Sequence, residues 1–236
     1  MGVADSEAAA FSRELAALKR EGCNVLVVDD PGGERAACER LLGGHDLDRH
    51  HVFLSTSVPL ADVLARHGSR DRDASRFGVV DATGSDTTRS AVAAAPTNAV
   101  GPALGASEPE WYDELDDPHD LEALFATVRS HLDRVVAGEQ GAPGELRFCL
   151  DSLDPLVDAV PEESLFRFLH LLTSTVRDAR GMGHAHASAG VHDETIDAIE
   201  PLFDATVHVE TRPDGTTQQR WVLHDADIET GWFELA

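Results

Sequence analysis

The sequence predicts a three-layer α/β sandwich, with a mostly parallel central sheet and an antiparallel hairpin at its C-terminal edge. Short β-branched runs such as 25–28 are apolar throughout, which is typical of strands buried on both faces of a parallel sheet. Amphipathic helical segments separate these runs through most of the chain, as expected for alternating βα units. Two late strand-like segments flank Pro213-Asp214-Gly215, a turn sequence typical of hairpins.

The first third of the chain alternates helices with strands. Phe11, Leu15 and Leu18 recur at helical spacing and Gly22 follows as a stop signal, so a helix is predicted to begin the domain. In order along this part, we expect helix 5–21, strand 25–28, helix 34–43, strand 52–54, helix 59–67 and strand 77–81.

The next segment, 82–110, is rich in Ala, Ser, Thr, Gly and Pro without a period, which predicts a long flexible surface loop. Asp117 is expected to cap the helix that follows, with Pro118 at its first position. The later elements are then helix 118–136, strand 146–150, helix 161–180, strand 183–189, helix 193–200 and strands 205–210 and 219–224. No linker divides the chain, so residues 1–236 are predicted to form a single domain that ends in a hairpin and tail at 205–236.

The charge balance excludes several classes of protein. The chain holds 43 Asp and Glu residues against 19 Lys and Arg residues, and its net charge is −24. Such a chain repels phosphate backbones and anionic lipid surfaces, so neither a nucleic-acid partner nor a membrane is expected. Lysine occurs once, at Lys19, and this acidic, lysine-poor composition resembles that of proteins from halophilic archaea.

The sequence predicts a cytoplasmic protein. The N-terminal residues lack the basic and apolar regions of a signal peptide, and no apolar run is long enough to cross a membrane. The three cysteines, Cys23, Cys38 and Cys149, are odd in number and widely spaced, so we expect buried free thiols rather than disulfides.

The turn after the first strand resembles a degenerate phosphate-binding loop. In a P-loop, G-x-x-x-x-G-K-[ST], glycine amides wrap the phosphates, the lysine neutralises them and the hydroxyl binds magnesium. The Pro31-Gly32 pair matches the Pro-Gly that is common in such loops. On that alignment every position that the chemistry requires is replaced: Asp29 for the first glycine, Glu34 for the second, Arg35 for the lysine and Ala36 for the hydroxyl residue.

The strand 146–150 and the residues after it carry a second resemblance. The strand ends in Asp151 and so resembles a Walker B strand, whose acid holds magnesium. The longer segment RFCLDSLDPLVDAVPEESLFRFLHLLTSTVRDARGMGHAH resembles the second half of the RecA/KaiC-type ATPase core, in which an Asp-Ser-Leu turn leads into a helix and the next strand. The similarity spans roughly 20–225, and it is most specific from about 117 onward. More closely, the chain resembles a group of haloarchaeal KaiC-like proteins with a degenerate Walker A loop.

This resemblance implies a P-loop NTPase fold, while the residues argue against the activity. The family uses a glutamate at the end of the second strand to activate water, and Ser55-Thr56-Ser57 stand at that place here. We therefore expect a catalytically silent domain with a regulatory, signalling or protein-interaction role, no catalytic residues and no cofactor. Because RecA-type domains often assemble side by side, a protein partner or a homo-oligomer is expected.

The alternative from the enzyme class is weak or partner-completed binding of Mg–ATP, with or without hydrolysis. The residues that would carry the remaining nucleotide contacts are Gly32, Gly33, Arg35, Asp151 and Ser152.

A third hypothesis starts from Asp29-Asp30 at the end of the first strand, which resembles the acidic pair of a response-regulator receiver domain. Asp81, at the end of the third strand, would then be the phosphoacceptor. Receivers also need a lysine after their last strand, and the only lysine precedes the first strand.

A metal site is the remaining candidate. His184 and His186 are two residues apart on a predicted strand and so share one face, with His192 close behind in the sequence. Asp193 or Asp151 would complete the set of ligands. The alternative is that these histidines are polar residues at a strand end that bind no metal.

Overall fold

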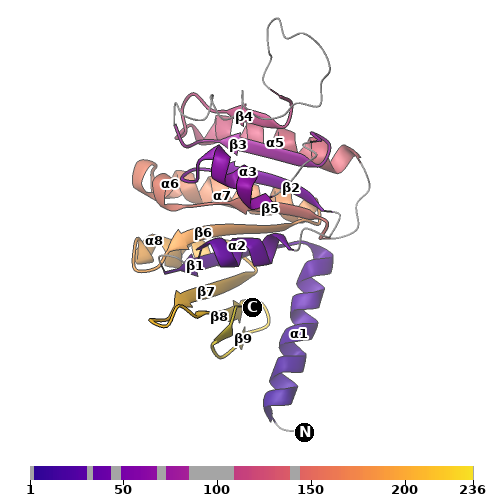
Figure 1. Ribbon diagram of the computed structural model, residues 1–236, viewed down its shortest axis with the longest axis vertical. Coiled ribbons are helices and arrows are strands. Elements are labelled where there is room, and N and C mark those ends of the chain that lie inside the picture. Colours follow the sequence, from indigo (N-terminus) through magenta and orange to yellow (C-terminus); the bar gives the residue numbers. More distant parts are fainter. Residues whose placement is uncertain are drawn as a thin grey trace, which may run out of the picture.

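The computed structural model describes residues 3–30, 34–43, 49–67, 73–84, 109–138 and 144–235. A twisted ten-stranded sheet forms its centre, and helices cover both faces (Figure 1). In order across the sheet, the parallel strands are β7 (Ala205–Thr211), β1 (Cys23–Asp29), β6 (Met182–Ser188), β5 (Leu146–Leu150), β2 (His50–Ser55), β3 (Phe77–Asp81) and β4 (Tyr112–Glu114).

The C-terminal edge of the sheet is antiparallel, as predicted. Strand β8 (Thr217–Leu223) pairs with β7, and it also pairs with β9 (Ile228–Glu229) and β10 (Phe233–Glu234). The mostly parallel three-layer α/β architecture is therefore confirmed.

Two groups of helices enclose the sheet. One face carries α5 (Leu121–Gly138), α6 (Asp154–Ala159), α7 (Glu162–Asp178), α8 (Asp193–Ile199) and the 3-10 turn η1 (Glu200–Leu202). The other face carries α1 (Val3–Glu21), α2 (Glu34–Leu42) and α3 (Leu60–His67). Each face has its own apolar core, because successive strand residues point to opposite sides: Leu26 packs under α7, whereas Val25 and Val27 pack with α1 and α2.

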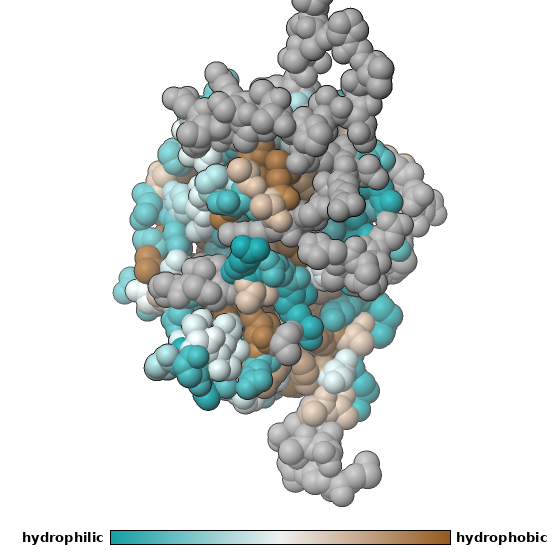
Figure 2. All heavy atoms as spheres, in the orientation of Figure 1, coloured by the Kyte–Doolittle hydropathy of each residue, from teal (hydrophilic) through white to brown (hydrophobic). Residues whose placement is uncertain are grey.

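Hydrophilic residues dominate the described surface over α2, and hydrophobic residues gather above and below that helix (Figure 2). Below it, α1 packs against the C-terminal strands through residues such as Phe11, whose ring lies 5.9 Å from that of Trp221 in an edge-on contact. No helix among the described residues is long and apolar enough to cross a membrane.

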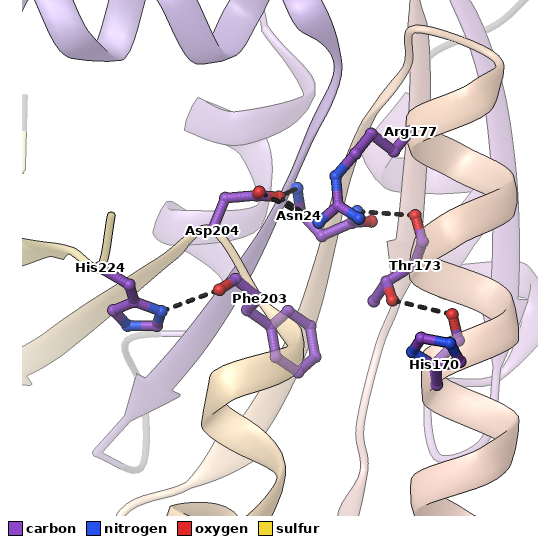
Figure 3. Close-up of polar contacts among 7 residues, drawn as sticks. All are labelled: Asn24, His170, Thr173, Arg177, Phe203, Asp204 and His224. Atoms are coloured by element: carbon purple, nitrogen blue, oxygen red, sulfur yellow. Dashed lines mark hydrogen bonds and ion pairs between the residues drawn. The ribbon is translucent and has the colours of Figure 1, made fainter. Parts of the chain in front are cut away.

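Polar side chains fasten α7 to the amino ends of β1 and β7 (Figure 3). Asn24 Nδ2 donates a hydrogen bond to the carbonyl of Thr173 on α7, at 2.9 Å. The Asp204 carboxylate, just before β7, accepts the backbone N–H of Asn24 at 2.7 Å and lies 3.0 Å from Nη2 of Arg177. These contacts fix α7 relative to the central strand of the sheet.

Most predicted elements are present with ends shifted by a few residues, and one capping prediction is wrong. The helix expected from Asp117 begins at Leu121, because Asp120 is the residue whose carboxylate accepts N–H bonds from Glu122 and Ala123. Asp117 instead accepts the N–H of His119 in a local turn. Most of the loop predicted at 82–110 lies outside the described residues, in the gap at 85–108.

Candidate functional site

A cavity of about 380 Å³ opens at the carboxyl edge of the parallel strands. Ligands of doubly wound sheets bind at this edge, where loops diverge from neighbouring strands. The ends of β1, β5 and β6 and the turn after β2 line it, together with α2 and α6: Asp29, Cys38, Ser57, Val58, Asp151, Ser152, Asp154, Pro155, His186, Ala187 and Ser188.

The carboxylate of Asp151 accepts hydrogen bonds from the turn that follows β2. The backbone N–H groups of Thr56, Ser57 and Val58 donate to it at 2.6, 3.1 and 2.5 Å. The hydroxyls of Ser55, Thr56 and Ser57 lie 3.2, 2.8 and 3.2 Å from the same carboxylate. Both oxygens of Asp151 are therefore surrounded by protein donors, and the residue ties β5 to the end of β2.

The two other carboxylates of the cavity are also paired with protein groups. Asp29 Oδ2 lies 2.7 Å from Nδ1 of His186, and both side chains are buried. Although burial opposes protonation, the carboxylate of Asp29 and the nearby thiol of Cys38 raise the pKa of His186 to about 9. Asp154 accepts hydrogen bonds from the hydroxyl and the backbone N–H of Ser188, at 2.5 and 3.2 Å.

Negative charge dominates the described lining of this cavity. Three carboxylates line the cavity, and none of the described lining residues is a lysine or arginine. A triphosphate entering it would meet three carboxylates, and His186, the one cationic group among the described lining residues, is already paired with Asp29. The one lysine, Lys19, lies beside Cys23 and Arg147 at the opposite, amino edge of the sheet, where burial and the charge of Arg147 lower its pKa.

The residues predicted for a degenerate nucleotide site are only partly brought together. Asp151 and Ser152 line the cavity. Arg35 is on α2, with its side chain 66% exposed and its Nε 2.8 Å from Glu39, and it does not line the cavity. Gly32 and Gly33 lie outside the described residues.

The receiver hypothesis is wrong, because Asp81 lies far from the Asp29-Asp30 pair. Strands β6, β5 and β2 separate β1 from β3, which places the two strand ends about 19 Å apart at the usual strand spacing. The Asp81 carboxylate instead accepts the N–H and hydroxyl of Thr83, at 2.9 and 2.7 Å.

The predicted histidine pair does form, with ring centres 5.2 Å apart on the face of β6 that lies under α2. The predictions of the further ligands for this site are wrong. His192 lies at the start of α8, where its Nε2 is 3.3 Å from Asp158, and Asp151 is bound by the turn after β2. The groups that join His184 and His186 are the thiols of Cys38 on α2 and Cys149 on β5.

Sequence reasoning missed these two thiols because their spacing carries no signal. Cys38, Cys149 and the histidines come from three separate elements, and only the packing of α2 on β5 and β6 unites them. The expected burial of the cysteines is confirmed, since Cys38 and Cys149 are 5% and 2% exposed.

The sequence model of DUF7504, a family of unknown function, matches residues 22–209. The chain belongs to DUF7504. The match runs from the start of β1 to β7 and so includes the three carboxylates of the cavity and the cysteine–histidine cluster.

The solved structure of another protein has a similar fold. The KaiC-like protein PH0186 of the hyperthermophilic archaeon Pyrococcus horikoshii OT3 superposes with a TM-score of 0.54 at 10% sequence identity, over 91% of this chain and 85% of that one. At this identity the likeness concerns the fold, and it confirms a RecA/KaiC-like architecture for this DUF7504 chain. A search of curated proteins finds no match.

Proposed function

We propose that this chain is a KaiC-like domain that does not hydrolyse ATP and acts as a regulatory or protein-interaction module. The observation that carries the proposal is the set of contacts made by Asp151. In an ATPase of this fold the acid at the end of this strand would hold magnesium. Here three backbone N–H groups and three hydroxyls surround its carboxylate, so magnesium binding would require the turn 55–58 to give up those bonds.

The charges and the sequence support the same proposal. Asp29 stands where a P-loop has its first glycine, and its carboxylate is buried against His186. The turn after β2 offers hydroxyls in place of a water-activating glutamate. Binding, charge neutralisation and water activation would each need a group that the described residues at this edge of the sheet do not provide.

Weak or partner-completed nucleotide binding is the second candidate function. The cavity of about 380 Å³ favours it, because small-molecule sites commonly have such volumes and lie at this edge of the sheet. A partner subunit would then have to supply the cation, with Asp151 and Ser152 making the contacts from this chain, and Arg35 would have to leave Glu39 to reach the cavity.

Calorimetric titration of the full chain with Mg–ATP separates the two functions. The experiment is run in concentrated KCl, which screens repulsion between the nucleotide and the acidic surface. A silent domain gives no saturable heat. A micromolar Kd that requires magnesium and is weakened by Asp151→Asn would contradict the proposal and support nucleotide binding.

A further inference from the structure

Four potential metal ligands converge beneath α2. Cys38 comes from α2, Cys149 from β5, and His184 and His186 from the neighbouring strand β6. One ligand atom from each side chain lies within 4.8 Å of all the others. The two sulfur atoms are 3.6 Å apart, well beyond the ~2.05 Å of a disulfide bond.

The burial of this cluster leaves polar atoms without partners. His184 and His186 are 2% and 3% exposed, and the Nε2 atom of each ring has no hydrogen-bond partner. An unsatisfied buried polar group destabilises a folded protein, so two adjacent ones need an explanation. A metal ion bound to both nitrogens would provide one.

Asp29 orients one of the two rings as an outer partner of a metal ligand would. Its Oδ2 lies 2.7 Å from Nδ1 of His186, which leaves Nε2 as the ring nitrogen available to a metal ion. Histidines that bind metals usually engage a carboxylate through the other ring nitrogen, which fixes the ring and strengthens the ligand.

We propose that Cys38, Cys149, His184 and His186 form a zinc site. Tetrahedral zinc with two thiolates and two imidazoles places its ligand atoms roughly 3.3–3.8 Å apart. The 3.6 Å between the sulfurs falls in this range, and the remaining separations need to close by about 1.5 Å at most.

Four protein ligands indicate a structural rather than a catalytic ion. The ion would clamp α2 to β5 and β6, immediately after the segment that forms the phosphate loop in ATPases of this fold. Cys38 and His186 also line the cavity at the carboxyl edge, which gives the ion a path of entry. This inference does not depend on the proposed function.

Elemental analysis of the full, tag-free chain, purified with reductant, tests the proposal. We expect about one zinc ion per chain. Removing zinc with a chelator and adding Co²⁺ should produce thiolate-to-cobalt charge-transfer absorption and the intense d–d bands of tetrahedral cobalt. Folded, reduced protein that takes up neither Zn²⁺ nor Co²⁺ would overturn the proposal. So would a mass two hydrogens lighter, which would show that Cys38 and Cys149 form a disulfide instead.

Variants locate the ion. Cys38→Ser, Cys149→Ser and His184→Gln should each lower the zinc content to a small fraction of the wild-type value. Cys23→Ala is the matched control, because Cys23 is equally buried but lies at the amino end of β1 outside the cluster, and it should keep its zinc. If a ligand variant fails to fold, the cobalt spectrum of the wild-type chain still decides the matter.

Asp29→Asn tests the outer partner separately. The variant keeps all four ligands, so zinc should still bind with a Kd about 10–100-fold weaker and with an unchanged tetrahedral cobalt spectrum. An unchanged Kd would contradict the positioning of His186 by Asp29.

Discussion

Asp151 accepts backbone N–H hydrogen bonds from three consecutive residues, Thr56 to Val58, and so stabilises the turn after β2. The turn is bound to the end of β5 by this side chain, and the hydroxyl of Thr56 also reaches the carbonyl of Ser152 at 2.5 Å. Loss of this carboxylate would therefore destabilise the turn whether or not a ligand binds.

Replacing Asp151 with Ala should lower the free energy of unfolding by about 2–4 kcal/mol, because the N–H groups of the turn lose their acceptor. Ser152→Ala is the control: its hydroxyl accepts a single bond, from the N–H of Asp154 at 3.2 Å, and its loss should cost about 1 kcal/mol or less. Denaturant unfolding measures both. A loss for Asp151→Ala that appears only when magnesium is present would mean that the carboxylate serves a metal ion.

At the scale of elements, α7 is held by the partly buried carboxylate of Asp204 and also carries a surface ion pair. Asp204 is bonded to Asn24 and Arg177, whereas Arg167 pairs only with Glu163 one turn away, with side chains 74% and 87% exposed. The two pairs differ in burial and so should differ in energy.

Asp204→Ala should destabilise the domain by about 1–3 kcal/mol, because the N–H of Asn24 and the guanidinium of Arg177 lose their acceptor. Arg167→Ala, on the same helix, should change the stability by less than about 0.5 kcal/mol. Thermal or denaturant unfolding of the two variants gives the comparison. Equal losses would show that the bonds at the amino end of β1 do not anchor α7.

Helix α5 is attached to the edge of the sheet by a neutral histidine. His131 Nε2 lies 2.6 Å from Asp113 on β4, and Nδ1 lies 2.5 Å from Nη2 of Arg134. Burial and the charge of Arg134 lower the pKa of His131, against the opposing effect of Asp113. Protonation of Nδ1 would remove the acceptor of the Arg134 hydrogen bond.

This depressed pKa predicts a loss of stability in acid. The unfolded chain protonates His131 at its ordinary pKa of 6.5, above the folded value, so the unfolded state binds more protons as the pH falls through 6.5. The stabilising contribution of the neutral ring is present above pH 6.5 and declines until the folded pKa is reached. His131→Gln should reduce this decline, which unfolding measurements from pH 8 to 5 would detect. Parallel pH profiles for wild type and variant would contradict it.

Local sequence signals predicted most of the helices and strands. They could not predict contacts between residues that are far apart in the sequence. The apolar stripe of 161–180 predicted α7, and the hairpin signal predicted β7 and β8. Strand β4 has only three residues and no apolar run, so no sequence pattern indicated it. It pairs with β3, and Tyr112 packs into the core beside that pairing. The bonds from the turn after β2 to Asp151 join residues more than 90 positions apart, and no spacing rule reports them.

At the scale of the whole molecule, the two edges of the sheet carry different charged groups. The chain has a net charge of −24, and its single lysine lies at the amino edge of the sheet. The carboxyl edge, where this fold binds ligands, carries carboxylates that are paired with protein groups. The RecA/KaiC-like architecture is therefore present, and no lysine or arginine is among the described residues that line the cavity at this edge.

Phosphate release from Mg–ATP by the purified full chain distinguishes a silent domain from an ATPase. We expect a rate equal to that of a protein-free blank in dilute and in concentrated KCl, and no difference between wild type and Asp151→Asn. Turnover above the blank that Asp151→Asn abolishes would contradict it, because Asp151 would then hold magnesium for catalysis.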